Sequence, residues 1–341
     1  MDENDSLILK NLLVHSRMSF TELAEKCGIS PTAVIRRYSR LREEGIILGH
    51  QMHLNPLSVG YESIAEAGIL TELADKKGVK EALEKKGNFL GGIISLGKYD
   101  IYGNLFAKKI EDLNGLIQRI DIRPYVKSLD VLIFSDLWNS PWHPENLLIK
   151  PTDKLETTSR RAISQEKPEP NVLDETDLHI IRALNDNSRT PFKEIANNLN
   201  AAVSSIIQRY HSLKARNLWT LSTTIIDTSK LGYKANADIY IRVTHRSTLP
   251  SVEAQLLEIP NTTFLAKYVG GAYDLRVAVV VSNFEDFFIV KDRILAIPDI
   301  SRAEFYFIKI PTGAHWLHDR IGETIIRHLL KIQTPSMTST T

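Results

Sequence analysis

The sequence contains a single cysteine, Cys27, so it cannot form an intrachain disulfide, and we expect a reducing compartment such as the cytoplasm. It has no run approaching ~18 uninterrupted apolar residues, which argues against a transmembrane helix and membrane partners. Its acidic, polar first residues are unlike a signal peptide. A formal net charge of +1 creates no long-range field toward nucleic acid, so any basic surface must be local.

The chain also lacks the common catalytic motifs, since no Walker loop, nucleophile elbow or HExxH is present. His315, His318 and His328 lie in one segment, but no cysteine or carboxylate set accompanies them at metal-ligand spacing. We therefore expect no metal site, no cofactor and no enzymatic activity.

What the sequence does contain is an internal repeat. Residues 5–61 align without a gap on residues 177–233, a shift of 172 positions. A shift of 174 positions aligns Gly97, Tyr99 and Asp100 with Gly271, Tyr273 and Asp274. A period of this length indicates a tandem pair of whole modules rather than a solenoid of short repeats. We call the two halves copy 1 and copy 2.

Copy 1 opens with three expected helices. Ser19 and Glu22 form a capping-box pattern for a helix over 20–27, which Gly28 can end. Ser30-Pro31 then starts a third helix that runs to about Glu44. Three helices with a tight turn between the second and third are typical of a helix-turn-helix.

Copy 2 repeats this plan with weaker signals. Asn200 stands where copy 1 has Gly28, and asparagine also tolerates the left-handed conformation. Its third helix begins near Ala201-Ala202 without a good cap. We therefore expect the start of that helix to be held less firmly than its counterpart in copy 1.

After each three-helix unit the pattern changes to strands and helices. A strand-like stretch (46–54 and 221–226) precedes the order strand, helix, strand, strand, helix, strand, which is the ferredoxin-like motif. In copy 2 these elements are expected at 237–243, 249–257, 263–269, 275–281, 284–294 and 302–310. The predicted class is α+β.

The predicted domains follow from these patterns. They are helix-turn-helix units at 1–50 and 173–222, ferredoxin-like domains at 51–138 and 223–313, a linker at 139–172, a C-terminal helix at 314–333 and a disordered tail at 334–341. The linker is assigned because its polar, proline-rich composition cannot bury a core.

One motif series resembles a known family. It comprises Asp5, Leu12, Ser16-Arg17, Glu22-Leu23-Ala24, Gly28-Ile29-Ser30, Arg37, Leu41, Glu44-Gly45-Ile46-Ile47, Asn55-Pro56 and Gly60. The series resembles the Lrp/AsnC family of transcriptional regulators over nearly the whole chain, twice, with copy 2 more diverged. The resemblance implies a (winged) helix-turn-helix joined to a ferredoxin-like domain called RAM. RAM domains dimerise and bind amino acids or other small effectors, so the chain looks like a covalent pseudo-dimer.

The third helix of each copy is the expected contact with double-stranded DNA. An apolar stripe packs inward, and the remaining surface fits a major groove. The candidate DNA-binding residues are Ser30, Thr32, Ala33, Arg36, Arg37 and Arg40 in copy 1, and Ser204, Ser205, Gln208, Arg209, His211 and Lys214 in copy 2. Arg37 and its equivalent Arg209 have a second interpretation, in which they hold the fold. Because the two sets differ, the preferred site is predicted to be asymmetric.

The repeated glycine–tyrosine–aspartate turn is the candidate effector site. The resemblance implies that this turn lies near the effector pocket at the RAM interface, and the residues are Gly97, Tyr99, Asp100, Gly271, Tyr273 and Asp274. The simpler interpretation is a β-hairpin turn whose aspartate makes a local hydrogen bond. The family's habit of assembly and the apolar stripe of the C-terminal helix also predict a dimer of chains.

Two alternative functions stay open. Siroheme decarboxylases use the same two-domain fold, with a histidine and an arginine/tyrosine cluster before the third RAM strand. Here those stretches, 91–96 and 264–268, contain no histidine. A sensor or scaffold that has lost DNA binding is the other alternative. The sequence therefore favours a DNA-binding regulator.

Overall fold

Two helix-turn-helix units begin the two halves of the chain. The computed structural model describes residues 1–72, 75–85, 89–95, 97–121, 124–135, 142–148, 169–310 and 320–333. Copy 1 opens with α1 (Glu3–Val14), α2 (Phe20–Cys27) and α3 (Pro31–Glu43), and copy 2 with α6 (Glu175–Asp186), α7 (Phe192–Asn198) and α8 (Val203–Ala215). The predicted capping is confirmed, because Ser19 and Glu22 form a capping box and Gly28 has φ +65°.

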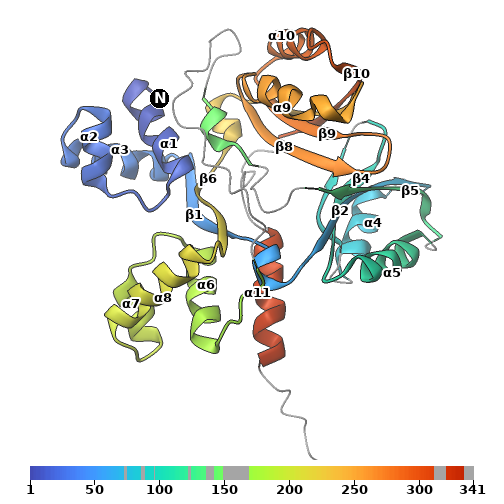
Figure 1. Ribbon diagram of the computed structural model, residues 1–341. Coiled ribbons are helices and arrows are strands. Elements are labelled where there is room, and N and C mark those ends of the chain that lie inside the picture. Colours follow the sequence, from blue (N-terminus) through green and yellow to red (C-terminus); the bar gives the residue numbers. More distant parts are fainter. Residues whose placement is uncertain are drawn as a thin grey trace, which may run out of the picture.

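A two-stranded ribbon joins the two units. Strand β1 (Ile47–Leu54) pairs antiparallel with β6 (Trp219–Ile226) of the other copy, and Figure 1 shows this ribbon between the two three-helix units. Gln51 lies opposite Thr223, which is its own equivalent in the repeat. A pseudo-two-fold axis therefore passes through this pair. The predicted domain boundaries after residues 50 and 222 fall inside the two ribbon strands.

Each copy then forms a ferredoxin-like sheet. Copy 1 contributes β2 (Ser63–Thr71), α4 (Lys76–Glu84), β3 (Phe89–Ile94), β4 (Ile101–Ala107), α5 (Ile110–Asp121) and β5 (Val126–Phe134). Copy 2 contributes β7 (Ala235–Val243), α9 (Leu249–Leu257), β8 (Thr262–Val269), β9 (Leu275–Val281), α10 (Phe284–Leu295) and β10 (Ile300–Lys309). These bounds agree with the predicted βαββαβ order.

The two sheets join at one edge into a single sheet of eight strands, in the order β10-β7-β9-β8-β5-β2-β4-β3. The joint is short, with Ile133 opposite Val269 and Phe134 opposite Tyr268. One face of each sheet buries an apolar core beneath its own helices, α4 and α5 in copy 1 and α9 and α10 in copy 2. The other faces of the two sheets meet across the pseudo-axis.

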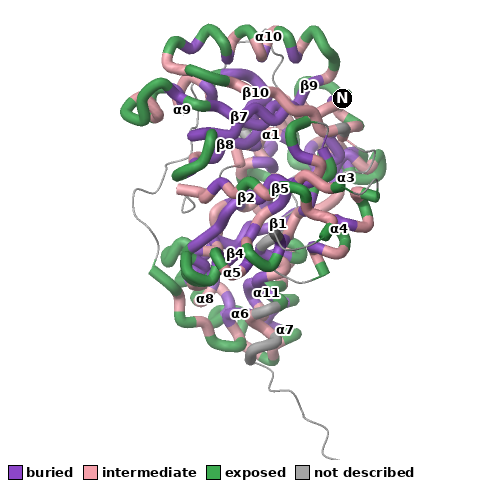
Figure 2. Tube along the Cα trace, turned by 90° about the vertical axis from the view of Figure 1, so that its right-hand side faces the viewer, coloured by how far each residue is buried: buried purple, intermediate pink, exposed green. Residues whose placement is uncertain are grey.

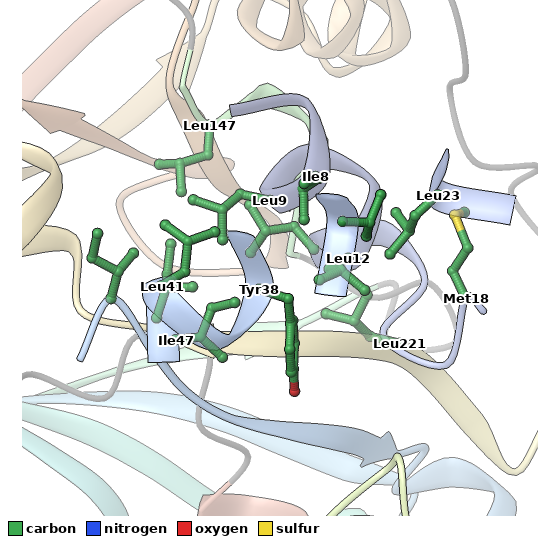
Figure 3. Close-up of a cluster of buried hydrophobic side chains, with 14 of the residues drawn as sticks. Ile8, Leu9, Leu12, Met18, Leu23, Tyr38, Leu41, Ile47, Leu147 and Leu221 are labelled. Carbon is green, nitrogen blue, oxygen red and sulfur yellow. The ribbon is translucent and has the colours of Figure 1, made fainter. Parts of the chain in front are cut away.

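Each helix-turn-helix unit packs against the RAM-like domain of the opposite copy. Leu221, Tyr233 and Val280 of copy 2 belong to the same buried cluster as the first three helices. Figure 3 shows Leu221 among the side chains of α1 and α3. In the same way Tyr61 and Phe106 of copy 1 join the cluster of the second unit. The two halves are therefore interlocked rather than lying in series.

Two segments outside the repeat also contribute to these cores. Leu147 is fully buried in the first cluster, so this part of the predicted linker does pack, because Leu147 and Leu148 are apolar residues within a polar stretch. Residues 149–168 lie outside the described residues. Helix α11 (Arg320–Gln333) lies against α6, with Ile325 and Ile326 buried in the second cluster.

Of the predicted apolar stripe, Ile325 is buried within the chain and Leu329 and Leu330 are half-buried against the second cluster, so the described part of the stripe already packs inside one chain. The start of that predicted helix, with His315 and His318, lies outside the described residues, as does the tail 334–341. Among the helices of the described ranges, none combines the length and the apolar character that crossing a bilayer requires.

Candidate nucleic-acid interface

Helix α3 presents a polar face whose start is firmly capped. The Ser30 hydroxyl accepts a hydrogen bond from the Ala33 amide at 3.2 Å, and Pro31 occupies the first turn. Val34, Tyr38 and Leu41 are buried, which confirms the predicted inward stripe. Thr32, Arg36 and Arg40 are exposed, whereas Ala33 is half-buried.

The arginines of this helix have different environments. Arg37 makes ion pairs with Asp2 at 2.6 Å and with the buried Asp5 at 2.9 Å, and Arg40 pairs with Asp5 at 2.5 Å. The hydrogen bonds that Arg37 donates to both carboxylates raise its pKa. Arg36 makes no ion pair with any residue that the structure describes. Arg36 is therefore the best placed of the three to contact DNA.

Arg209 repeats the arrangement of Arg37 in copy 2. It pairs with Asp174 at 2.6 Å and with Asp177 at 2.8 Å, which joins α8 to the first turn of α6. The structure thus gives Arg37 and Arg209 the fold-holding role that was their second interpretation. As DNA contacts they remain a weaker proposal, because binding a phosphate would compete with two carboxylates.

Helix α8 presents a different face from α3. Ala202, which precedes its first residue, provides no side-chain cap, as predicted. Ser204, Ser205, Gln208, His211 and Lys214 are all exposed. In the repeat, Gln208 is the equivalent of Arg36. The two exposed faces therefore carry different side chains at equivalent positions.

Reciprocal arginines fix the two helix-turn-helix units to each other. Arg17 lies over the Phe192 ring at 4.4 Å and donates hydrogen bonds to the carbonyls of Ser188 and Thr190, the latter at 3.1 Å. Arg189 lies over Phe20 at 4.9 Å and donates to the carbonyls of Ser16 and Met18 at 2.6 and 2.9 Å. We call this pair of contacts the arginine clasp.

The clasp is centred on the pseudo-axis. The hydroxyls of Ser16 and Ser188, equivalent residues of the two copies, are 2.6 Å apart and fully buried. Burial lowers the pKa of both Arg17 and Arg189. Because the clasp grips main-chain carbonyls on both sides, it sets the separation of α3 and α8.

A buried histidine connects α3 to the ribbon. The residue is His50, whose Nε2 is 2.7 Å from the Tyr38 hydroxyl and whose Nδ1 is 3.0 Å from the Thr224 hydroxyl. Thr224 donates its own hydrogen to the carbonyl of Leu12 and must therefore accept from Nδ1–H. Burial, followed by Arg189 and Arg42, lowers the pKa of His50 to about 3, so the ring is neutral near pH 7.

Because the pKa of His50 is lowered in the folded protein, we expect the free energy of unfolding to depend on pH. The unfolded chain protonates His50 near pH 6.5, whereas the folded protein keeps it neutral, so stability is present above pH 6.5 and falls as the pH drops toward 3. At pH 5 the loss from this group is about 2 kcal/mol. Urea unfolding at pH 7.5 and pH 5 should show a smaller difference for His50→Gln than for the parent. If the stability difference between the two pH values were the same in both proteins, His50 would not be its source. Burial also lowers the pKa of His15, and this contribution is common to both proteins.

The candidate effector turns lie where the two copies meet. A side chain added at Gly97 would collide with the Tyr306 ring of copy 2, and one added at Gly271 would lie 2.7 Å from Leu132 of copy 1. Tyr99 donates to Asp130 at 2.7 Å, and Tyr273 donates to Glu304 at 2.5 Å, which are equivalent pairs. The turns are therefore at the interface that the resemblance implied.

The two aspartates of these turns are already paired within their own copies. Asp100 accepts the amide of Thr71 at 3.0 Å and pairs with Lys76 at 2.5 Å. Burial alone would raise the pKa of Asp100, but Lys76 and the Thr71 amide hold it below its usual value. Asp274 is fully buried and binds Arg246 and the Val243 amide. Both carboxylates brace the connection to the first helix of their RAM-like domain.

Sequence reasoning missed the arginine clasp and a buried polar network between the sheets. Ser16-Arg17 and Ser188-Arg189 were recognised as repeated motifs, and their repetition was the available signal for the clasp. The signal for the network was a charged residue within an otherwise apolar strand, Glu66 in β2 and Arg276 in β9. Such residues are rarely buried unless they are paired.

Known proteins resemble the chain in both its parts and its whole. Residues 1–47 match a model described as winged helix-turn-helix DNA-binding, and residues 173–214 match the AsnC-type helix-turn-helix domain. The crystal structure of the siroheme decarboxylase NirDL covers 97% of this chain and 98% of its own, with a TM-score of 0.62 and 15% identity. That likeness concerns the fold alone. Fold and site together define a protein with two helix-turn-helix domains of the AsnC type.

Two regulators in curated collections of proteins are similar in sequence. The HTH-type transcriptional regulator LrpA of Pyrococcus horikoshii is 37% identical over 118 residues, 34% of this chain and 83% of that protein. The regulatory protein AsnC of Escherichia coli is 27% identical over 135 residues, 39% of this chain and 89% of that protein. The chain belongs to the Lrp/AsnC family of transcriptional regulators, in a tandem form.

Proposed function

We propose that the protein is a sequence-specific, DNA-binding transcriptional regulator in which one chain acts as a complete pseudo-dimer. The observation that carries the proposal is the arginine clasp, which holds two helix-turn-helix units about one pseudo-axis with α3 and α8 exposed. Double-stranded DNA is the partner, and Arg36 and Gln208 stand at equivalent places on the two reading faces.

The test combines two measurements on the purified full-length protein. Binding to fragmented genomic DNA is followed by gel shift, and bound fragments are sequenced. Enrichment of a common sequence supports the proposal, and binding without any enrichment, or no binding, contradicts it. Arg36→Ala serves as the matched variant, because its side chain is exposed and its loss should leave the fold unchanged.

We propose that the protein is not an enzyme, although its whole-chain fold is shared with NirDL. The strands β3 and β8 carry no histidine between residues 89–94 and 262–269. Titration with iron-uroporphyrin, the class of molecule bound in a second NirDL structure, separates the two functions. A shifted tetrapyrrole absorbance without DNA binding would favour an enzyme.

We propose that an effector such as an amino acid, if it acts on this protein, binds near the turns of Asp100 and Asp274. Asp100 is the better probe, because it is half-buried and paired with Lys76. Asp274, in contrast, is fully buried and paired with Arg246. A thermal-shift screen of amino acids should give a hit whose stabilisation is lost in Asp100→Asn. Exposed Asp112→Asn is the control, and a shift that survives in both variants would place the pocket elsewhere.

We also propose that two chains associate, now through α10 rather than α11. Phe284, Phe288 and Leu295 lie on one side of α10 and are 76%, 54% and 51% exposed, on the helix at the top of Figure 2. Antiparallel pairing of two α10 helices through these side chains would cover them in both copies. Sedimentation equilibrium should give a dimer for the parent and a single chain for Phe288→Glu. A single-chain mass for the parent would contradict this proposal.

A further inference from the structure

A buried polar network lies where the inner faces of the two sheets meet. Arg276 of copy 2 binds Glu66 of copy 1 and, through Nε, Asp238 at 3.1 Å. Tyr102 of copy 1 donates to Asp238 at 2.7 Å, and Tyr268 of copy 2 donates to Glu66 at 3.2 Å. Tyr240 also donates to Glu66, and none of these six residues as a whole is more than 9% exposed.

The two carboxylates of the network occupy equivalent positions in the two copies, whereas its arginine has no arginine at the equivalent position. Glu66 and Asp238 are equivalent in the repeat, 172 positions apart, and they lie in β2 and β7. Arg276 is the equivalent of Tyr102, 174 positions away, in β9 and β4. Each copy thus supplies one carboxylate, but only copy 2 supplies a cation.

All four carboxylate oxygens accept a hydrogen bond from Arg276 or a tyrosine hydroxyl, which is the pattern expected when both acids are ionised. Burial alone would lower the pKa of Arg276, but attraction to Asp238 and Glu66 raises it well above its usual value. A buried cation that faces two carboxylates is costly to remove, because both acids would then lack a charged partner.

We propose that this network is a pairing code, which makes the RAM-like domain of copy 1 accept only a copy 2 domain as its partner. Two copy 1 domains would bury two glutamates and two tyrosines with no cation between them. Exchange of domains between chains to form like pairs would therefore leave one pair with two uncompensated buried charges. The RAM face is accordingly reserved for pairing unlike copies, and any association of whole chains must use another surface.

Full-length variants can remove the buried cation or move it to the other copy within one chain. Arg276→Tyr gives copy 2 the tyrosine of copy 1 and so imitates the copy 1–copy 1 pair. The double variant Tyr102→Arg with Arg276→Tyr moves the cation to the other copy but keeps one cation between the same two acids. Tyr240→Phe is the control, since it removes one hydroxyl from the network and leaves every charge in place.

Urea unfolding followed by small-angle scattering measures the outcome. We expect the urea midpoint of Arg276→Tyr to fall by about 1–2 M, with an expanded scattering radius, and the double variant to recover at least half of that loss. Failure of Arg276→Tyr to fold while the double variant folds is equally supportive. A double variant no better than Arg276→Tyr, or failing to fold alongside it, overturns the pairing code, as would a midpoint for Arg276→Tyr equal to that of Tyr240→Phe.

Discussion

Replacing Arg17 or Arg189 by alanine should each lower the free energy of unfolding by about 3 kcal/mol, with nearly equal effects from the two positions. Each guanidinium donates to two main-chain carbonyls of the opposite unit and lies on an aromatic ring, so its loss leaves those carbonyls without a donor. Urea unfolding monitored by circular dichroism measures the change.

Two controls separate the clasp from general effects of charge. Arg36→Ala also removes an arginine from the same unit, but its side chain is exposed, and the change should stay within about 0.5 kcal/mol. Arg17→Lys keeps the charge but cannot reproduce the guanidinium fork, so it should behave almost like Arg17→Ala. A lysine variant as stable as the parent would show that charge alone, rather than the clasp, joins the units.

A DNA selection with the parent protein should yield a non-palindromic site. The exposed faces of α3 and α8 differ at equivalent positions of the repeat. Gln208 is the equivalent of Arg36, and Ser204 is the equivalent of Thr32. Arginine suits guanine and glutamine suits adenine, so the two half-sites cannot be the same. Arg36→Ala should weaken binding by about 5- to 150-fold, and Gln208→Ala should have a smaller effect.

The decisive variant makes the two faces alike. Gln208→Arg should shift the selected sequence of the copy 2 half-site toward that of copy 1 and raise affinity for a palindromic probe. The half-sites should lie about one helical turn apart, ~34 Å, because the clasp fixes α3 and α8 in place. A perfect palindrome selected by the parent protein would show that the two helices read DNA equivalently, against this interpretation.

Sequence reasoning succeeded where the signals are local. Ser19 with Glu22 and Gly28 act through bonds and angles within a few residues, so the helix ends could be predicted closely. The predicted bounds of α9 and β9 also match the observed ones. Each of these features depends only on near neighbours in the chain.

The sequence could not show that each helix-turn-helix unit packs against the RAM-like domain of the opposite copy. Burial of Leu221 or Val280 is favourable against any apolar surface, because the hydrophobic effect has no direction. The stripe of α11 predicted an interface, yet the pattern is the same whether its partner is α6 or a second chain. The sequence likewise left Arg37 with both a DNA-binding and a fold-holding interpretation, because its partners Asp2 and Asp5 lie more than 30 residues away along the chain.

Because each helix-turn-helix unit packs on the opposite copy, the first unit cannot complete its core until copy 2 has been synthesised. The first unit is made within the first 44 residues, but its core is completed by Tyr233 and Val280. A ribosome adding ~5–20 residues per second needs roughly 10–50 s to reach the last of these. During that interval the first unit lacks part of its apolar cover. The nascent chain therefore cannot present a finished DNA reader until nearly all of copy 2 has emerged.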